Sequence, residues 1–592
     1  MKWHLDNNLS AFISATMDVG ELLQNWTSEI TPKPGGKRRN PDKSEKQPKS
    51  KRGKNEEKDL NKHIPKKSND SSETSRFDTA NANMGPLTEE DKERLLAMVE
   101  DDEQGETIDE STIKKHILSF ERKVTKNQEM RIKFPDLPQK FMESELELHD
   151  EIHKLNVIAT VPEYYDVFVK LNAVSTALGL LSHENSDISI ATIELLQEIT
   201  ESDNLNENEE GANLLLDALL NGQLITVLLQ TLQRLDEKQK GDANGVHNTL
   251  AIIENLADFR PEICITAGEQ GLHTWLLKRL KKRMFDSNKL YASEILAILL
   301  QNHEENRQLI GETNGVDNLL QALAIYKGYN PSNQEEIEYM ENIFNCLCST
   351  LLYGPNKELF LKGEGLQLMI LMLREKKMSR TSALKVLAYA MTGEEGVNNC
   401  SKFVEILGLR SVFPLFMKPP KRNKKTGNST EESEEHACSI IASLFRHSAG
   451  ANRSRLIQKF VEDDHVKIDR LMELYRKYQR RVQAADARIE REKEDLEEQG
   501  EIIDEAMEDM FYLNRLDAGL FTLQLIVCTM LESCCSGVQS IKQRVLTILS
   551  QHGGSMKQIK QVMREYAGHI GDASSEQSEI ERRRLLSLVD RF

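Results

Sequence analysis

The feature that most limits the fold of this chain is a helical block that recurs from about residue 140 to residue 460. Each block opens at a small residue, continues as a short amphipathic helix, and ends after a polar break in a second, longer helix. The opening residues lie 49, 49, 44, 50 and 43 positions apart: Ala173, Gly222, Gly271, Gly315, Gly365 and Gly408. One block cannot bury its own apolar face, so stacked copies must share a core. The repeat therefore predicts an all-α solenoid.

Several of these spacings exceed the ~40 to 47 residues of armadillo and HEAT units. Extra residues are therefore expected in the turns at 236–245, 326–334 and 419–435. Glycine at the opening of a block is expected to permit the tight turn between a short helix and the next one. The predicted fold class is an armadillo/HEAT-like α-solenoid.

Composition divides the chain into four parts. Residues 1–84 form a basic tail that is too poor in apolar side chains to fold, so it is expected to be disordered. Residues 85–160 predict an N-terminal helical, HEAT-like cap with an acidic loop at 100–110, and residues 161–460 hold the armadillo-like repeats. Residues 461–592 predict a helical C-terminal cap. Within it, 466–499 is expected to be one long charged helix that first packs on the array and is then exposed or in a coiled coil.

Charge is unevenly distributed over these parts. The whole chain has a net charge of −18, but residues 31–76 contain 15 Lys and Arg against 7 Asp and Glu. The array that follows the tail is correspondingly more acidic than the average. An acidic array argues against direct binding of nucleic acid and indicates protein partners that carry basic segments.

Two short basic clusters in the tail have the arrangement of a bipartite nuclear import signal. The residues are Lys37, Arg38, Arg39, Lys49, Lys51, Arg52 and Lys54. An import receptor is therefore an expected partner of the tail. The alternatives are a merely solvated basic tail and a nucleic-acid arm, but the near absence of aromatic side chains leaves no means of stacking on bases.

The array offers a candidate groove for basic peptides. Importin-like armadillo proteins hold such peptides with Asn on the last helix of each repeat and Trp one turn earlier. Here Asn255 occupies such a place, but Gln197 and Gln301 stand at the related positions, and no Trp precedes them. Acidity remains as the attraction for Lys and Arg. The candidate groove residues are Gln197, Glu198, Glu254, Asn255, Asp258, Glu294, Gln301 and Glu341. The alternative is that these acids form an ordinary solvated face.

Signals for an enzyme fail on inspection. His149 and His153 are four residues apart, but the HExxH order and a third ligand are missing, so we expect no metal site. No P-loop or dinucleotide loop occurs, and no catalytic residue or cofactor is predicted. The eight cysteines are interpreted as buried thiols of a reducing compartment, and no apolar run is long enough to predict a membrane span. A weak nuclear-export-type spacing occurs at Val161, Tyr164, Val167 and Val169. The same spacing is typical of a buried helix face, which is the alternative interpretation.

Six segments resemble one known family. They are Met17–Leu23, Ile132–Leu146 (IKFPDLPQKFMESEL), Gly245–Cys264, Phe360–Lys377, Thr381–Leu387 and Phe511–Phe521. Through them the chain resembles the beta-catenin-like protein 1 family, an armadillo-type family associated with pre-mRNA splicing. The resemblance covers about residues 85–592 together with 17–23. The family's start aligns with Met17, so residues 1–16 are interpreted as an extension.

The resemblance implies a nuclear scaffold associated with the spliceosomal complex that contains the Prp-nineteen ubiquitin ligase and a Myb-like splicing factor. Members of the family bind basic, localisation-type segments of splicing factors. The main hypothesis is therefore a non-enzymatic nuclear adaptor that binds such segments through an acidic armadillo surface. The alternative is a nuclear transport receptor or adaptor of importin-like type. A cell-adhesion armadillo protein would need a basic groove for acidic partners, which has the opposite sign of charge. Homo-oligomerisation is left open.

Overall fold

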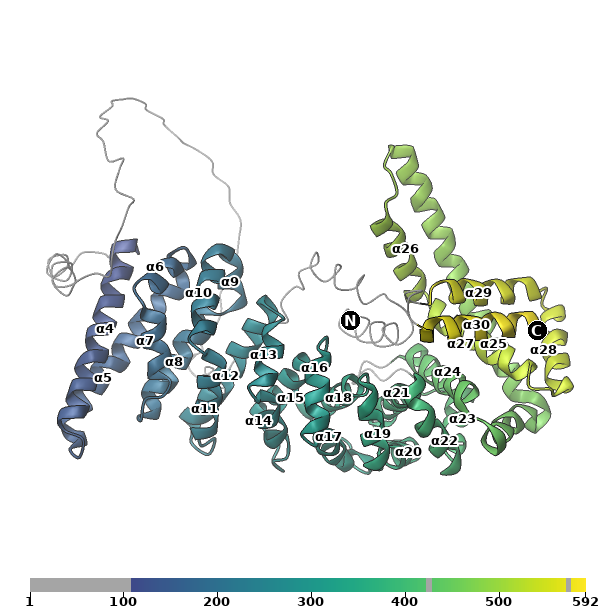
Figure 1. The fold of residues 1–592 in the computed structure, drawn as a ribbon, viewed down its shortest axis with the longest axis horizontal. Coiled ribbons are helices and arrows are strands. Elements are labelled where there is room, and N and C mark those ends of the chain that lie inside the picture. The colour runs from purple at the N-terminus through teal and green to yellow at the C-terminus, as the bar shows by residue number, and fades with distance from the viewer. Residues whose placement is uncertain (1–107, 422–428, 571–575) are drawn as a thin grey trace, which may run out of the picture. The chain divides into compact units, whose positions relative to one another are not determined.

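The computed structural model of the chain describes residues 108–421, 429–570 and 576–592, which belong to one compact unit (Figure 1). Within these ranges the chain forms α-helices and short 3-10 helices, with no strand. The predicted all-α solenoid is therefore confirmed. The import-type residues Lys37 to Lys54, the family-like segment Met17–Leu23 and most of the acidic stretch at 100–110 lie outside the described residues.

The repeat consists of three helices rather than the two that the sequence suggests. A short first helix precedes each predicted opening, a second helix follows it, and a third, generally longer helix completes the unit. In the described array the units are α6 (Tyr165–Lys170), α7 (Ala173–Leu180) and α8 (Ser186–Ile199); α10 (Glu209–Asn221), α11 (Leu224–Arg234) and α12 (Lys240–Phe259); α13 (Ile263–Glu269), α14 (Leu272–Leu280) and α15 (Ser287–Leu300); α16 (Glu304–Glu312), α17 (Gly315–Leu323) and α18 (Gln334–Thr350); α19 (Gly354–Lys362), α20 (Gly365–Glu375) and α21 (Arg380–Met391); α22 (Val397–Glu405), α23 (Leu409–Met417) and α24 (Thr430–His447).

The turn between the first and second helices always contains one residue in the left-handed conformation. These residues are Asn172 (φ 61°), Gln223 (φ 60°), Gly271 (φ 93°), Asn314 (φ 56°), Glu364 (φ 59°) and Leu407 (φ 64°). The expectation that the opening glycines themselves supply this conformation is wrong except at Gly271. The other glycines serve close packing instead. A Cβ atom on Gly365 would lie 2.3 Å from the Phe360 ring, and one on Gly408 would lie 2.5 Å from the Phe403 ring.

The third helices form a continuous layer through the array (Figure 1). In chain order α8, α12, α15, α18, α21 and α24 each pack against the next, and α27 (Leu520–Cys534) packs on α24. Every residue of α27 is buried, as its apolar sequence predicts. The layer therefore continues from the repeats into the C-terminal helices, and any side chain that points outward from it belongs to one shared face.

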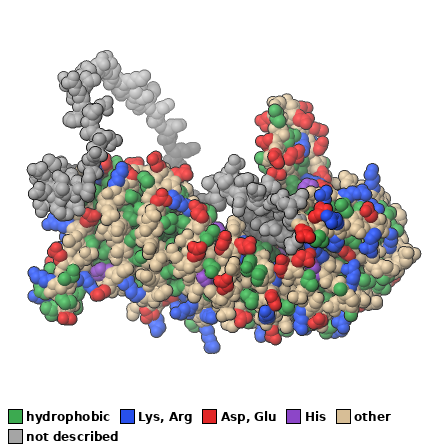
Figure 2. Space-filling model, in the orientation of Figure 1, with side chains coloured by type: hydrophobic (Ala, Val, Ile, Leu, Met, Phe, Trp, Pro, Cys, Tyr) green, Lys and Arg blue, Asp and Glu red, His purple; other side chains and the backbone are tan. Residues whose placement is uncertain are grey.

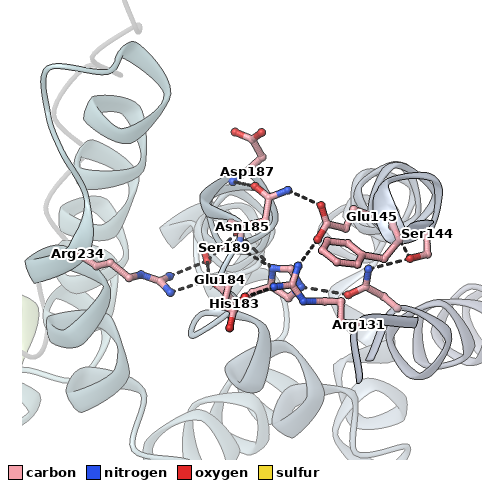
Figure 3. A network of polar contacts seen from close by, with 11 residues as sticks. Arg131, Ser144, Glu145, His183, Glu184, Asn185, Asp187, Ser189 and Arg234 are labelled. Atoms are coloured by element: carbon pink, nitrogen blue, oxygen red, sulfur yellow. Dashed lines mark hydrogen bonds and ion pairs between the residues drawn. The ribbon is translucent and has the colours of Figure 1, made fainter. Parts of the chain in front are cut away.

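Two helices precede the repeats. They are α4 (Glu110–Lys133) and α5 (Pro138–Leu155), which form an antiparallel hairpin that packs on α6, α7 and α8. Figure 3 shows the polar network that joins this hairpin to the first repeat. Asn127 donates to the Ser144 hydroxyl and pairs with His183, and Asn185 donates to Glu145. Burial and the nearby Arg131 both lower the pKa of His183, so the ring joins the network in its neutral form at neutral pH.

The C-terminal helices begin with a run from Gly450 to Gln499, α25, that is broken at Glu462 to His465. Asp463, Asp464 and His465 are left-handed there, with φ of 53°, 54° and 66°. The long charged helix predicted over 466–499 follows this break. Its distal part pairs with α26 (Glu505–Asp517) in a hairpin that stands away from the packed helices (Figure 1). The remaining helices are α28 (Gln539–Gln551), α29 (Met556–Gly568) and α30 (Glu576–Arg591).

All eight cysteines are free thiols, seven of them buried and Cys535 half-buried, which agrees with the interpretation from sequence. No single helix of the described ranges has both the length and the apolar character to cross a membrane. Two bent helix pairs, α10 with α11 and α26 with α27, meet those criteria by length and composition only.

Candidate peptide-binding face

The structure places the predicted groove residues on four consecutive members of the third-helix layer. Gln197 and Glu198 lie on α8, Glu254, Asn255 and Asp258 on α12, Glu294 on α15 and Glu341 on α18, while Gln301 ends α15. Because these four helices pack side by side, residues up to 144 positions apart in the sequence share one layer. A peptide-binding face formed by these residues therefore lies on this layer of helices.

The eight residues differ in how much they offer to a ligand. Glu198 and Asp258 are exposed, whereas the other six are half-buried. The Glu254 carboxylate accepts a hydrogen bond from the Tyr291 hydroxyl on the neighbouring helix. The backbone carbonyl of Gln301, rather than its side chain, accepts from the Arg307 guanidinium. The Glu254 carboxylate therefore already has a partner inside the protein, whereas the carboxylates of Glu198 and Asp258 are exposed to solvent.

Glu341 is the acid that departs furthest from the expectation of a negative groove. Its two carboxylate oxygens accept hydrogen bonds from the Ser382 hydroxyl at 2.9 and 2.8 Å. Burial raises its pKa to about 7, although Ser382 and Lys385 both oppose that shift. The side chain is consequently only partly ionised at neutral pH and attracts a basic ligand less than its formal charge suggests.

A lysine interrupts the acidic series at the next repeat. Lys385 lies on α21, and its ammonium group donates to the Asn345 side chain of α18 at 3.1 Å. A fixed positive charge at this point repels Lys and Arg side chains of a ligand. The acidic residues of the predicted groove therefore end at α18, before Lys385.

A group of acids beside the third-helix layer was missed by reasoning from the groove pattern. It lies where α8 ends and the short helix α9 (Ser202–Glu207) begins. We call the carboxylates of Glu198, Glu201, Asp203, Glu207 and Asp258 the acidic ridge; Glu201 is half-buried and the other four are exposed. The signal was present in the sequence, because residues 194–210 contain seven Asp or Glu and no Lys or Arg.

Two hydrogen bonds fix the acidic ridge to the third-helix layer. The Ser202 hydroxyl donates to the Asp258 carboxylate on α12 at 3.3 Å, and the Asn204 side chain donates to the Glu198 carbonyl of α8 at 2.7 Å. The C-terminal end of α8 adds the partial negative charge of the helix dipole. Figure 2 shows acidic side chains along the upper edge of the left-hand helices, and again over the projecting α25–α26 hairpin.

Repeated asparagines do occur in the array, but on the first helices. They lie on the first helices of three successive repeats, α16, α19 and α22, and on α25, which follows the last repeat: Asn306, Asn356, Asn399 and Asn452. Each donates from its amide nitrogen to a backbone carbonyl of the preceding first helix: Cys264, Arg307, Lys357 and Ser401, at 2.9, 2.7, 3.1 and 3.4 Å. We call this series the asparagine ladder. It connects repeat to repeat, which is a structural task, and differs from the peptide-binding asparagines of importin-like proteins.

The other residues singled out in the sequence show no site geometry. Val161 separates two 3-10 helices, Tyr164 ends the second of them, and Val167 and Val169 lie on α6, so the export-type spacing does not run along one helix. The His149 and His153 ring nitrogens are 3.3 Å apart, and no group of three or more potential metal ligands occurs among the residues that the structure describes.

The sequence of this chain matches a known protein family over most of its length. Residues 93–564 match the family described as catenin-beta-like, Arm-motif containing nuclear. The chain belongs to this catenin-beta-like family. It is 58% identical over 487 residues to beta-catenin-like protein 1 of Bos taurus, which covers 82% of this chain and 86% of that protein. The beta-catenin-like protein 1 homolog of Schizosaccharomyces pombe is 33% identical over 484 residues, covering 81% and 82% of the two chains.

Similarity to solved structures is distant for this catenin-beta-like chain. An engineered protein matches with a TM-score of 0.41 and 15% identity, covering 75% of this chain and 95% of its own. A chain from a structural study of the interaction between cadherin and beta-catenin matches with a TM-score of 0.38 and 13% identity, covering 84% and 94%. The family is described as nuclear and its members share the Arm motif, which agrees with the repeats seen here.

Proposed function

We propose that the protein is a non-enzymatic adaptor of the nuclear pre-mRNA splicing machinery that binds basic, localisation-signal-like segments of splicing factors. The observation that carries this proposal is the acidic ridge at the end of α8, next to α12 of the same layer. Membership of a nuclear Arm-motif family supports the compartment and the scaffold type. Partners of the expected kind include components of the Prp-nineteen-type spliceosomal complex.

The residues of this region suggest distinct tasks in holding such a segment. The exposed carboxylates of Glu198, Glu207 and Asp258 attract the Lys and Arg side chains of a ligand. Gln197 and Asn255 are half-buried on the neighbouring helices α8 and α12, where their amides could pair with the peptide backbone. This arrangement predicts fast, salt-sensitive association, because exposed charges are screened over about 8 Å at physiological ionic strength.

Charge reversal tests the acidic ridge directly. We expect Glu198→Lys combined with Asp258→Lys to weaken binding of a labelled Lys/Arg-rich splicing-factor peptide about tenfold or more, since each lost attraction is worth roughly 1 kcal/mol at an exposed site. Fluorescence anisotropy at several salt concentrations gives the Kd values. The same variants in pull-downs from nuclear extract should lose the bound splicing factors.

The matched control carries the same change of charge elsewhere. Glu312→Lys combined with Glu375→Lys alters two exposed acids at the end of α16 and on α20. It should leave the Kd within about twofold of the native value, since α16 and α20 belong to other repeats than the acidic ridge. Equal weakening by both pairs, or binding that does not respond to salt, contradicts the proposal.

The alternative function, an importin-like transport receptor, has less support from these residues. Lys385 interrupts the acidic layer, and the repeated asparagines of the array are used between repeats. A transport receptor should bind a generic import peptide as tightly as a splicing-factor segment. The anisotropy assay distinguishes the two functions when both peptides are measured side by side.

A further inference from the structure

The hairpin of α4 and α5 exposes large apolar side chains that the rest of the array does not cover. Ile132 is 81% exposed, Leu137 52%, Met142 56% and Leu146 60%. Isolated apolar side chains are normal at a surface, but several large ones on one helical hairpin indicate a contact that is not yet accounted for. The opposite side of the same hairpin is buried against α6, α7 and α8.

The exposed group continues as a stripe along α5. Met142, Leu146, His149 and His153 follow one another at intervals of four, three and four residues, so they lie on one side of the helix. The two imidazole rings are in contact, with centroids 4.5 Å apart. We call these four residues the end stripe. Its length along the helix axis is about 16 Å, since each residue advances ~1.5 Å.

We propose that the chain's own acidic segment, residues 88–106, covers the end stripe. The segment has the apolar residues for this contact, because Leu95, Leu96 and Val99 stand at helical spacing. The family match begins at residue 93, so part of this segment belongs to the stretch shared with the family although it precedes the first described residue. The exposed apolar residues and most of the segment proposed to cover them therefore lie within the stretch that matches the family.

Charge complementarity supports the same occupant. Residues 88–106 contain nine Asp or Glu and two Lys or Arg, whereas α4 contains seven Lys or Arg and three Glu. On α4 the side chains of Arg122, Lys126 and Lys133 are exposed, and Lys126 is paired with Glu147 of α5. Although α5 itself contains five Asp or Glu and two Lys, an acidic segment that reaches Arg122 and Lys133 gains attraction as well as apolar contact.

The path of the chain makes the contact reachable. The described chain starts at Ile108, just before α4, and in an antiparallel hairpin the start of α4 lies near the end of α5. The residues that precede Ile108 therefore start near His153. With increasing distance from α4 along the chain, they can run along α5 from His153 towards Met142. Twelve helical residues extend about 18 Å, which matches the length of the end stripe. Tethering to α4 gives this segment a high effective concentration relative to any separate partner.

Chemical labelling of the full chain tests the contact. We expect the thiol of the Met142→Cys variant to react with a maleimide about tenfold more slowly than the thiol of Met284→Cys, since a side chain covered by a docked segment reacts only when that segment opens. Met284 is 79% exposed in the turn between α14 and α15 and provides the same substitution far from the hairpin. The native protein gives the background from its own cysteines.

A second change identifies what covers the stripe. Leu95→Asp with Leu96→Asp, added to Met142→Cys, should bring the labelling rate within about twofold of that of the Met284→Cys variant. Circular dichroism confirms that each variant keeps its helix content. Equal labelling of the two single variants overturns the proposal, as does protection that survives the Leu95 and Leu96 substitutions. Protection that rises with protein concentration indicates a second copy of the chain as the occupant and also overturns it.

Discussion

At the scale of single residues, Glu341 shows how the fold changes the meaning of an acid in the sequence. Its formal charge placed it in the candidate groove, but burial where α18 packs against α21 raises its pKa, even though the hydrogen bond from the Ser382 hydroxyl favours the ionised form. Ser382 is 41 positions away in the sequence, as Tyr291 is 37 positions from Glu254. Such pairs depend on which helices meet and could not be read from local sequence.

The raised pKa of Glu341 predicts a dependence of stability on pH. A carboxyl whose pKa rises from 4.5 to about 7 on folding stabilises the folded state below about pH 4.5 and loses that contribution as the pH rises through about 7. Glu341→Gln cannot titrate. The Tm of the native protein minus that of the variant should therefore fall between pH 5 and pH 8.

Differential scanning fluorimetry across this pH range measures the difference. Glu375→Gln, an exposed substitution on α20, is the control and should follow the native protein at every pH. A difference for Glu341→Gln that stays constant with pH would show that the carboxyl is not held partly neutral.

At the scale of elements, the third helices and the long helix after residue 466 were predictable, because their apolar spacing is strong. The short first helices were not, since α13 and α22 are too short for a periodic pattern to stand out. The role of the opening glycines was misjudged for a related reason. Sequence shows that a residue is small, but only packing shows whether φ or space requires it, as the Phe360 ring against Gly365 does.

The asparagine ladder also operates at this scale and predicts a loss of stability. Asn356 is 1% exposed and donates to the carbonyls of Arg307 and Thr350. Asn356→Ala leaves both buried carbonyls without this donor, which should cost about 1–3 kcal/mol. Urea denaturation followed by circular dichroism should show a lower midpoint.

The control for this prediction is Asn302→Ala, which changes an exposed asparagine in the turn before α16. It should stay within about 0.5 kcal/mol of the native protein. If the two variants unfold at the same urea concentration, the ladder does not contribute to the stability of the array.

At the scale of the whole molecule, the sequence combines two parts of opposite charge. The basic residues at 31–76 precede an array that is acidic over its N-terminal repeats. The solenoid class was predictable from the repeat alone, whereas the acidic ridge required the positions of α8, α9 and α12 relative to one another. The proposed function therefore assigns to one chain both a segment of the kind that import receptors bind and a surface for similar segments of other proteins.

This division predicts that import and peptide binding can be separated. Deletion of residues 24–84 should abolish nuclear accumulation of the fluorescently tagged chain in cells, because the two basic clusters are removed. The purified deletion variant should bind the basic peptide with unchanged Kd, since the acidic ridge is intact. A deletion variant that still accumulates in the nucleus means that another segment directs import.

The asparagine ladder has one further consequence. Each hydrogen bond of the ladder connects a repeat only to the one before it, so we expect the repeats to unfold one after another along the array. Unfolding of such an array starts at its less stable end. One end of this array is closed by α25 and the helices that follow it, while the other ends in the exposed apolar side chains of α5. Fraying should therefore be directional, and whatever covers α5 determines where it begins.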